Sequence, residues 1–186
     1  MSAPHGCTLL LGGARSGKST LAVEIGLRYA GPVCFVATAR LDLPDTATDH
    51  DLVARVARHR AERPAHWVTI ETTAVADAVR DAPADALVIV DCITLWVADA
   101  MMAPGGAARI EDAAVTLGTT AATRPAPTVL VSNEVGLGVH PATELGRGYR
   151  DVLGRVNRTL AAHAHRTLFL AAGRAVRLDD PWELLG

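Results

Sequence analysis

An eight-residue stretch near the amino terminus constrains this chain more than any other part of it. Residues 12–19 read Gly-Gly-Ala-Arg-Ser-Gly-Lys-Ser, which is the P-loop pattern for phosphate binding. The apolar run at residues 7–11 predicts a buried strand before it, and the apolar spacing of residues 20–27 predicts a helix after it. Strand, glycine loop and helix are the context that the motif requires, so a chance glycine-rich turn is the weaker interpretation.

The chemistry of this stretch follows from its residue types. Glycines let successive backbone N–H groups point at phosphate oxygens, and the following helix adds the partial positive charge of its amino terminus. Lys18, the only lysine among 18 basic residues, is expected to reach the outer phosphates, and the Ser19 hydroxyl to ligate Mg2+. The residues predicted to contact a nucleotide here are Gly12, Gly13, Ala14, Arg15, Ser16, Gly17, Lys18 and Ser19.

The rest of the chain alternates between strand and helix patterns. Further strands are expected at residues 33–37, 67–71, 87–91, 128–132 and 167–171, and helices at 51–63, 73–81, 93–102, 111–120 and 144–164. Loops are expected at 40–49, 124–127 and 133–141, and a short tail from residue 178. This alternation predicts an α/β fold with a mostly parallel sheet and helices on both faces, and residues 1–186 are expected to form a single P-loop nucleotide-binding domain.

Composition narrows the class of protein. The formal net charge of −2 gives no electrostatic case for nucleic-acid binding. No run of about 18 apolar residues is present, so no transmembrane segment is expected, and the first six residues lack the basic region of a signal peptide. Cys7, Cys34 and Cys92 lie in apolar stretches without metal-ligand spacing, which favours buried thiols in a reducing cytoplasm.

Polar residues fall where the predicted strands end, the edge at which parallel sheets bind ligands. Asp91 follows four apolar residues, the pattern of a carboxylate that orients Mg2+, although an Asp that caps the next turn shows the same pattern. Asn133 and Glu134 are candidates for contacting substrate or orienting water. A turn-forming Asn and a solvated Glu remain equally open interpretations. Thr38 and Ser132 also end strands.

The helix expected at 51–63 carries Arg55, His59 and Arg63 at spacings of four residues, which places them on one face. Guanidinium groups disfavour a charged imidazole, so His59 should stay neutral and nucleophilic, and arginines can hold phosphate oxygens. From spacing alone, a basic solvated helix with an incidental histidine is the simpler interpretation. His163 and His165 are expected on different sides of a later helix, and no zinc site is expected.

Taken together, these motifs resemble one enzyme family over nearly the whole chain. They are the P-loop, Ala37-Thr38-Ala39, Arg55 through His59 with Arg63-Pro64 and Trp67, Asp91-Cys92-Ile93-Thr94-Leu95-Trp96, Ser132-Asn133-Glu134-Val135-Gly136-Leu137-Gly138, Tyr149-Arg150-Asp151 and Gly154-Arg155-Val156-Asn157. Their order and spacing resemble the bifunctional adenosylcobinamide kinase / adenosylcobinamide-phosphate guanylyltransferase of cobalamin biosynthesis.

The resemblance implies a RecA-like P-loop fold and a cytoplasmic homotrimer that catalyses two reactions. ATP or GTP phosphorylates the aminopropanol hydroxyl of adenosylcobinamide. GTP then guanylylates an enzyme histidine, and GMP passes to adenosylcobinamide phosphate to give adenosyl-GDP-cobinamide. By the same resemblance, His59 carries GMP. The P-loop and strand-end patterns already assign Mg2+ to Ser19 and Asp91. Further nucleotide contacts are implied at Ala37, Thr38, Ala39, Arg60, Ala61, Glu62, Arg63, Glu71 and Asp91.

Two other functions share parts of this pattern. A simple P-loop kinase of a small hydroxylated substrate would transfer phosphate with no covalent nucleotide adduct, and His59 would then be structural. A non-enzymatic nucleotide switch would hydrolyse its nucleotide slowly and present an apolar patch to a partner. A GMP adduct on the protein separates the bifunctional enzyme from both.

Overall fold

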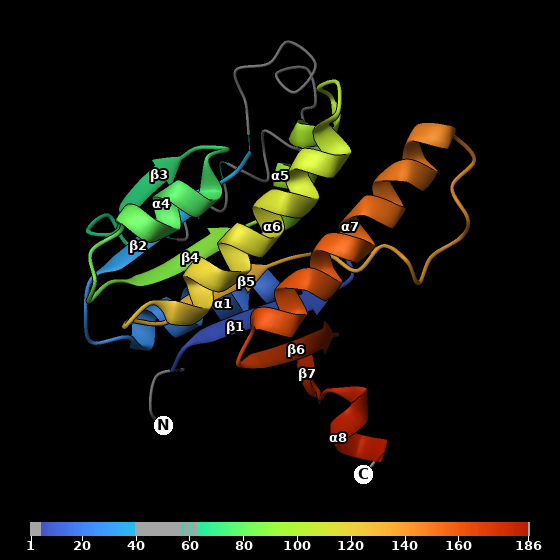
Figure 1. Ribbon diagram of the computed structural model, residues 1–186. Coiled ribbons are helices and arrows are strands. Elements are labelled where there is room, and N and C mark those ends of the chain that lie inside the picture. The colour runs from blue at the N-terminus through green and yellow to red at the C-terminus, as the bar shows by residue number, and fades with distance from the viewer. Residues whose placement is uncertain (1–4, 40–56, 58–59, 61–62, 186) are drawn as a thin grey trace.

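The computed structural model describes residues 5–39, 57, 60 and 63–185 (Figure 1). In this part of the chain, seven strands form one sheet in the order β3-β2-β4-β5-β1-β6-β7. Every neighbouring pair is parallel except β6 and β7, which are antiparallel. The strands are β1 (Cys7–Gly12), β2 (Val33–Ala37), β3 (Val68–Glu71), β4 (Leu87–Asp91), β5 (Thr128–Val131), β6 (Arg166–Ala171) and β7 (Arg174–Leu178).

Helices cover both faces of this sheet, as the alternation of patterns predicted. The described helices are α1 (Lys18–Arg28), α4 (Val75–Asp81), α5 (Ile93–Met101), α6 (Gly106–Thr123), α7 (Glu144–His163) and α8 (Pro181–Leu185). The apolar residues of α1 pack on one face, and those of α4, α5, α6 and α7 pack on the other. None of the described helices is long and apolar enough to cross a membrane.

The central strands carry continuous apolar runs because both of their faces are covered. In β4, Val88 and Val90 point toward α4–α7, whereas Leu87 and Ile89 point toward α1, and all four side chains are fully buried. The same alternation in β1 sends Leu9 to one layer and Leu10 to the other. The core is therefore two apolar layers separated by the sheet.

The carboxyl-terminal segment differs from the sequence prediction. The chain turns back after β6 through Ala172 and Gly173, whose φ angles are 51° and 71°, and β7 pairs with β6. Two successive residues with positive φ are typical of the tight turns that join antiparallel strands. The prediction missed β7 because each of its residues is exposed at the sheet edge and no buried pattern marks it. The short helix α8 was missed as well.

Two other local predictions were wrong. The helix expected at 111–120 begins five residues earlier, at Gly106, where a Cβ atom would lie 1.8 Å from the Ala100 carbonyl oxygen. Gly106 thus permits a close approach of the start of α6 to the end of α5. His165 does not share a helix with His163, because α7 ends at His163. The His165 ring accepts a hydrogen bond at Nδ1 from the Cys7 N–H at 3.1 Å.

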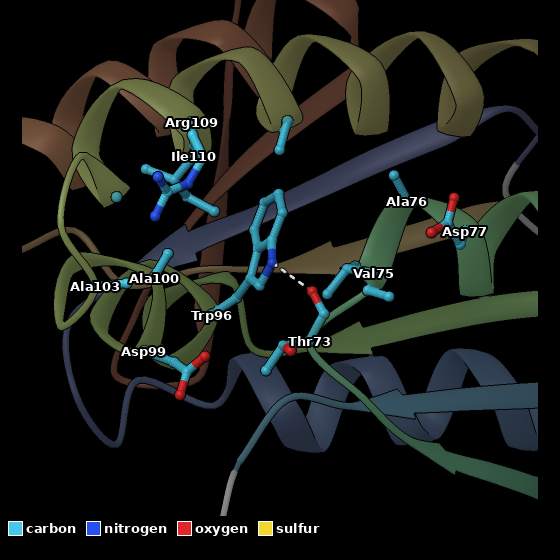
Figure 2. Close-up of a pocket in the computed structure, with 13 residues that line it drawn as sticks. Thr73, Val75, Ala76, Asp77, Trp96, Asp99, Ala100, Ala103, Arg109 and Ile110 are labelled. Carbon is cyan, nitrogen blue, oxygen red and sulfur yellow. Dashed lines mark hydrogen bonds between the residues drawn. The ribbon is translucent and has the colours of Figure 1, made fainter.

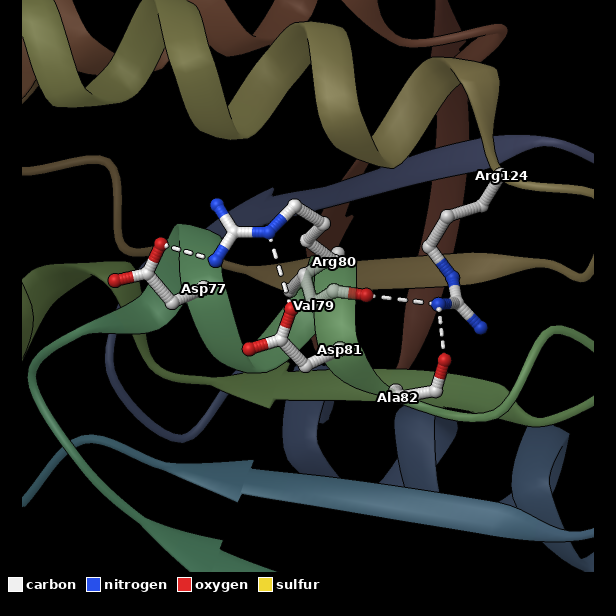
Figure 3. Close-up of polar contacts among 6 residues, drawn as sticks. All are labelled: Asp77, Val79, Arg80, Asp81, Ala82 and Arg124. Atoms are coloured by element: carbon white, nitrogen blue, oxygen red, sulfur yellow. Dashed lines mark hydrogen bonds and ion pairs between the residues drawn. The ribbon is translucent and has the colours of Figure 1, made fainter.

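Arg124, which follows α6, forms hydrogen bonds with the segment that joins α4 to β4 (Figure 3). Its Nη1 donates to the carbonyls of Val79 and Ala82 at 2.7 and 3.1 Å. Its Nη2 donates to those of Pro83 and Ala86, both at 2.8 Å. One guanidinium group therefore donates to four carbonyls, of which that of Pro83 also accepts the Ala86 N–H. Burial lowers the pKa of Arg124.

Candidate nucleotide-binding site

The predicted P-loop joins β1 to α1 at the carboxyl edge of the parallel sheet (Figure 1). Gly12 has φ 148°, and a Cβ atom there would lie 2.3 Å from the carbonyl oxygen of Leu170. Gly17, at the start of α1, has φ 101°. Because L side chains rarely adopt these backbone conformations, the motif glycines are required by the shape of the loop.

Lys18 lies inside the loop, with only 6% of its surface exposed. Its ammonium group donates to the carbonyls of Gly12 and Gly13 at 2.9 and 2.7 Å and to Ser16 Oγ at 3.2 Å. Burial lowers the pKa of Lys18, while electrostatic interaction with the neighbouring Cys92 and Asp91 acts in the opposite direction. A buried ammonium held only by neutral acceptors is suited to receiving phosphate oxygens.

The rim of the loop has the geometry of an anion site. Arg15 adopts a left-handed conformation with φ 57°, and Gly13, Ala14 and Arg15 are exposed. Within the described residues, the N–H groups of Ala14 and Arg15 donate to no partner. Free N–H groups beside a helix amino terminus favour a bound phosphate.

The predicted residue Thr38 joins the end of β2 to the residue that follows β4. Thr38 is buried, and its hydroxyl both donates to the Cys92 carbonyl at 2.6 Å and accepts from the Cys92 N–H at 3.0 Å. This pair of hydrogen bonds holds Asp91, one residue earlier, at the same edge as the P-loop. Ala37 and Ala39 flank Thr38 and are partly exposed.

Asp91 and Ser19 fit the magnesium role that the sequence suggested. In the described ranges, no three His, Cys, Asp or Glu side chains gather into a metal site. Mg2+ in phosphate sites needs only one or two protein ligands, because phosphates and water supply the rest. Ser19 is in the first turn of α1, and the charge of Asp91 reaches Lys18. A hydroxyl and a carboxylate beside the phosphate loop are a suitable donor set.

Ser132 and the main chain of Asn133 have structural contacts, while the side-chain role of Asn133 stays as open as the sequence left it. The Ser132 hydroxyl donates to Asn157 Oδ1 at 2.6 Å, and Asn157 Nδ2 donates to the Asn133 carbonyl at 3.0 Å. The Asn133 N–H donates to Thr94 Oγ1 at 2.9 Å. These bonds tie α7 and α5 to the end of β5.

Two arginines of the histidine-containing segment have described contacts. Arg60 forms an ion pair with Glu71 at the end of β3, which brings together two positions predicted to bind nucleotide. Arg63 stacks on the Phe35 ring, with its guanidinium carbon 3.7 Å from the ring centre. Arg55, His59, Ala61 and Glu62 lie outside the described residues, as does the loop expected at 40–49.

The sequence did not predict a pocket of about 320 Å3 between α4, α5 and α6 (Figure 2). The Trp96 indole extends into the space between these helices and donates from Nε1 to the Thr73 carbonyl at 2.9 Å. Asp99 and Arg109 also line the pocket. Trp96 ends the Asp-Cys-Ile-Thr-Leu-Trp motif, which is the one signal in the sequence that marked this region.

The chain is similar to known proteins over most of its length. A family model described as "Cobinamide kinase / cobinamide phosphate guanyltransferase" matches residues 8–178. "Bifunctional adenosylcobalamin biosynthesis protein CobP" of Pseudomonas aeruginosa is 39% identical over 167 residues, covering 89% of this chain and 92% of that protein. "Bifunctional adenosylcobalamin biosynthesis protein CobU" of Salmonella typhimurium is 35% identical over 184 residues, covering 91% and 98%.

Solved structures resemble the chain in fold only. The type III secretion ATPase EscN of enteropathogenic E. coli superposes with a TM-score of 0.58 at 14% identity, over 90% of this chain and 43% of that one. The Pyrococcus horikoshii protein PH0250 superposes with a TM-score of 0.55 at 7% identity, over 92% and 85%. The fold is thus the RecA-like α/β fold of P-loop nucleoside triphosphatases.

Proposed function

Because the chain belongs to the cobinamide kinase / cobinamide phosphate guanyltransferase family, we propose that it catalyses both of that family's reactions. The observation that carries the proposal is the P-loop with its buried Lys18, placed beside Asp91 at the carboxyl edge of the sheet. This arrangement binds a triphosphate, which both reactions consume.

In the first reaction, ATP or GTP binds at residues 12–19 and phosphorylates the hydroxyl of adenosylcobinamide. Lys18 turns from the loop carbonyls to the outer phosphates, and the N–H groups of Ala14 and Arg15 hold phosphate oxygens. Ser19 and Asp91 would hold Mg2+, which when bound would neutralise charge that develops on the transferred phosphate. The work of the protein is positioning and electrostatic stabilisation.

In the second reaction, the imidazole of His59 attacks the α-phosphorus of GTP. A nitrogen–phosphorus bond forms, the bond from the α-phosphorus to its bridging oxygen breaks, and pyrophosphate leaves. The phosphate of adenosylcobinamide phosphate then takes the GMP and frees the histidine. The support for His59 is its place in the family motif, next to Arg60, which is paired with Glu71. Splitting one transfer into two steps is the usual advantage of a covalent intermediate.

The proposal includes the oligomeric state, the location and the substrates of the enzyme. We expect residues 1–186 to act as one nucleotide-binding domain in a cytoplasmic homotrimer, with adenosylcobinamide and its phosphate as substrates. The resemblance supports the trimer. Exposed apolar side chains on β7 and α8 offer surface that association would cover: Val176, Leu178, Trp182, Leu184 and Leu185.

Intact mass after incubation with GTP and Mg2+ tests the covalent step. The wild-type protein should gain the mass of one GMP, and mild acid should remove it, because phosphoramidates are acid-labile. His59→Ala should lose the adduct and guanylyl transfer but keep kinase activity. His66→Ala, which changes an exposed neighbouring histidine, should keep all three.

Two outcomes would contradict the assignment of His59. One is an undiminished adduct in His59→Ala, and the other is peptide mapping that finds GMP on His50 or His66. A wild-type protein that phosphorylates the acceptor without any adduct would instead be a simple P-loop kinase.

A further inference from the structure

A polar pocket of about 370 Å3 opens between α7 and the loop after β5. Glu134 forms one side of it, and Arg150, Gly154, Arg155 and Arg158 of α7 form the other. None of these residues was assigned a role in nucleotide binding or in the transfer of GMP. Three arginines and two carboxylates, Glu134 and Asp151, nevertheless surround this one hollow, so the cavity is highly charged.

This pocket adjoins the phosphate loop through a shared hydrogen-bond acceptor. The Glu134 N–H donates to the Gly12 carbonyl at 3.0 Å, and the Lys18 ammonium donates to the same oxygen at 2.9 Å. The main chain of Glu134 and the ammonium that is to hold the outer phosphates therefore meet at one atom. Asn157, on the buried face of α7, ties that helix to the main chain of residue 133, so the far wall is anchored as well.

The arginines of the pocket differ in whether they form ion pairs with other residues. Arg150 pairs with Asp151 at 2.9 Å, and Arg155 pairs with Glu111 at 2.9 Å. Arg158 is exposed, and no residue in the described ranges forms a hydrogen bond or ion pair with it. An arginine that lines a cavity without a protein partner has its donors available for an anionic ligand.

Glu134 is held in place but keeps one oxygen available. Its Oε1 accepts the Gly136 N–H at 2.6 Å, and none of the described residues donates to Oε2. The side chain is partly buried, so its orientation is constrained. A carboxylate fixed by one oxygen can accept a proton on the other.

Gly154 is a glycine in the middle of a helix, and no packing contact requires it. It lies in the interior of the 20-residue helix α7, where glycine costs about 0.8–1 kcal/mol relative to alanine. A Cβ atom at this position would meet nothing within 4 Å. Packing within the chain therefore does not explain the glycine. Its effect is to leave the floor of the pocket open between Arg150 and Arg158.

We propose that this pocket is the acceptor site of the kinase reaction and that Glu134 is its general base. The proposal rests on the proposed function. The hydroxyl-bearing arm of the cobinamide enters the pocket, and Glu134 Oε2 takes the hydroxyl proton. The alkoxide oxygen forms a bond to the γ-phosphorus, the bond from that phosphorus to the β–γ bridging oxygen breaks, and a nucleoside diphosphate leaves. Arg158 binds the phosphate that has been transferred.

The chemistry of the pocket suits both forms of this acceptor. Before phosphoryl transfer the acceptor presents a neutral hydroxyl, which needs a carboxylate beside the phosphate loop. After transfer it presents a phosphate, which needs arginine. A volume of about 370 Å3 holds a short side arm, so the bulk of the corrinoid stays outside.

Steady-state kinetics with GTP, Mg2+ and adenosylcobinamide tests the two charged residues. Glu134→Gln should lower kcat for phosphorylation by about 100-fold or more, because a general base contributes a factor of about 100 to 10,000. Arg158→Ala should raise the KM for adenosylcobinamide by about tenfold or more, since it removes one charge-assisted contact. Arg166→Ala, an exposed arginine at the opposite, amino end of β6, is the matched control and should change neither constant.

Gly154→Ala separates a binding role from a structural one. Alanine should stabilise α7 and raise Tm, because helix propensity improves and no atom is near enough to clash. The same variant should raise the KM for adenosylcobinamide, because the methyl group enters the pocket. A raised Tm with an unchanged KM would mean that no ligand approaches this glycine and would overturn the proposal.

The remaining outcomes distinguish this proposal from the proposed function. If the wild-type protein forms a GMP adduct and phosphorylates the acceptor while Glu134→Gln and Arg158→Ala keep its kinetic constants, only the acceptor site is wrong. If Glu134→Gln loses GTP affinity by calorimetry, the pocket belongs to the nucleotide site and the proposal is again overturned. If the wild-type protein does neither reaction, the proposed function fails and the acceptor site fails with it.

Discussion

Lys18 shows how a single side chain prepares the phosphate site. Its ammonium spans the loop by bonding to two carbonyls and one hydroxyl, so it pulls the backbone of Gly12 and Gly13 into the curve that a phosphate requires. Burial lowers its pKa because the charged form loses hydration. A bound triphosphate would reverse that effect by placing negative oxygens around the ammonium.

We predict that Lys18→Ala weakens GTP binding by about 10- to 100-fold, because one charge-assisted phosphate contact contributes about 1.5–3 kcal/mol. Lys18→Arg should also bind poorly, since a planar guanidinium cannot occupy the space of a compact ammonium between Gly12 and Gly13. Isothermal titration calorimetry measures both. Equal GTP affinity in wild type and Lys18→Ala would rule out phosphate binding by this residue.

At the scale of elements, α4, β4 and α6 are joined by Arg124 rather than by helix packing alone. Its four hydrogen bonds satisfy the last carbonyls of α4 and those of the turn before β4. Arg80, shown beside it in Figure 3, pairs with Asp77 and Asp81 on the surface of α4. The two arginines differ in their surroundings, because solvent screens the pairs of Arg80 whereas Arg124 serves partly buried carbonyls.

Arg124→Ala is therefore expected to destabilise the fold by about 3 kcal/mol, since it removes the side-chain donor from the carbonyls of Val79, Ala82 and Ala86 at once. Arg80→Ala is the matched control and should shift the unfolding midpoint far less, because its partners are exposed carboxylates. Urea denaturation followed by circular dichroism measures both midpoints. Equal midpoints for the two variants would show that the four bonds contribute nothing net.

At the scale of the whole molecule, the two apolar layers bury thiols as well as hydrocarbon side chains. Cys7 is fully buried in β1, and desolvation raises its pKa from 9.0 to about 12. Desolvation, followed by the charge of Asp91, raises the pKa of Cys92 to about 12. All three cysteines are free thiols. Cys7 and Cys34 are buried as predicted, whereas Cys92, at the sheet edge, is partly exposed.

These shifts predict that the protein loses stability in alkali. Above about pH 9 the unfolded chain releases thiol protons that the folded chain keeps, so the free energy of unfolding falls as pH rises toward 12. Below pH 9 both the folded and the unfolded chain keep these protons, so the thiols add no pH dependence to the free energy of unfolding. Each thiol contributes at most about 1.4 kcal/mol per pH unit.

Urea unfolding at several pH values from 8 to 11 checks this effect. The Cys7→Ala variant should show a shallower loss of stability above pH 9 than wild type, while other titrating groups contribute equally to both. Identical slopes would show that the Cys7 thiol is accessible to hydroxide in the folded protein.

The sequence by itself determined the local units of the fold. The P-loop is a strand, a loop and a helix made from consecutive residues, so glycine positions and apolar spacing were enough to place it. The bounds of β2 and β4 were predicted to the residue, because a strand covered on both faces must be apolar throughout. The family was also readable from sequence, since its motifs lie in a fixed order along the chain.

Only the tertiary structure decided which distant residues meet. The contact of Glu134 with Gly12, the pocket against α7, the carbonyls held by Arg124 and the pairing of β7 with β6 all join segments that the chain alone does not bring together. Their residues are polar or exposed, so no hydrophobic period marks them. Strand order determines these contacts, and strand order depends on how every helix packs against the sheet rather than on any local pattern.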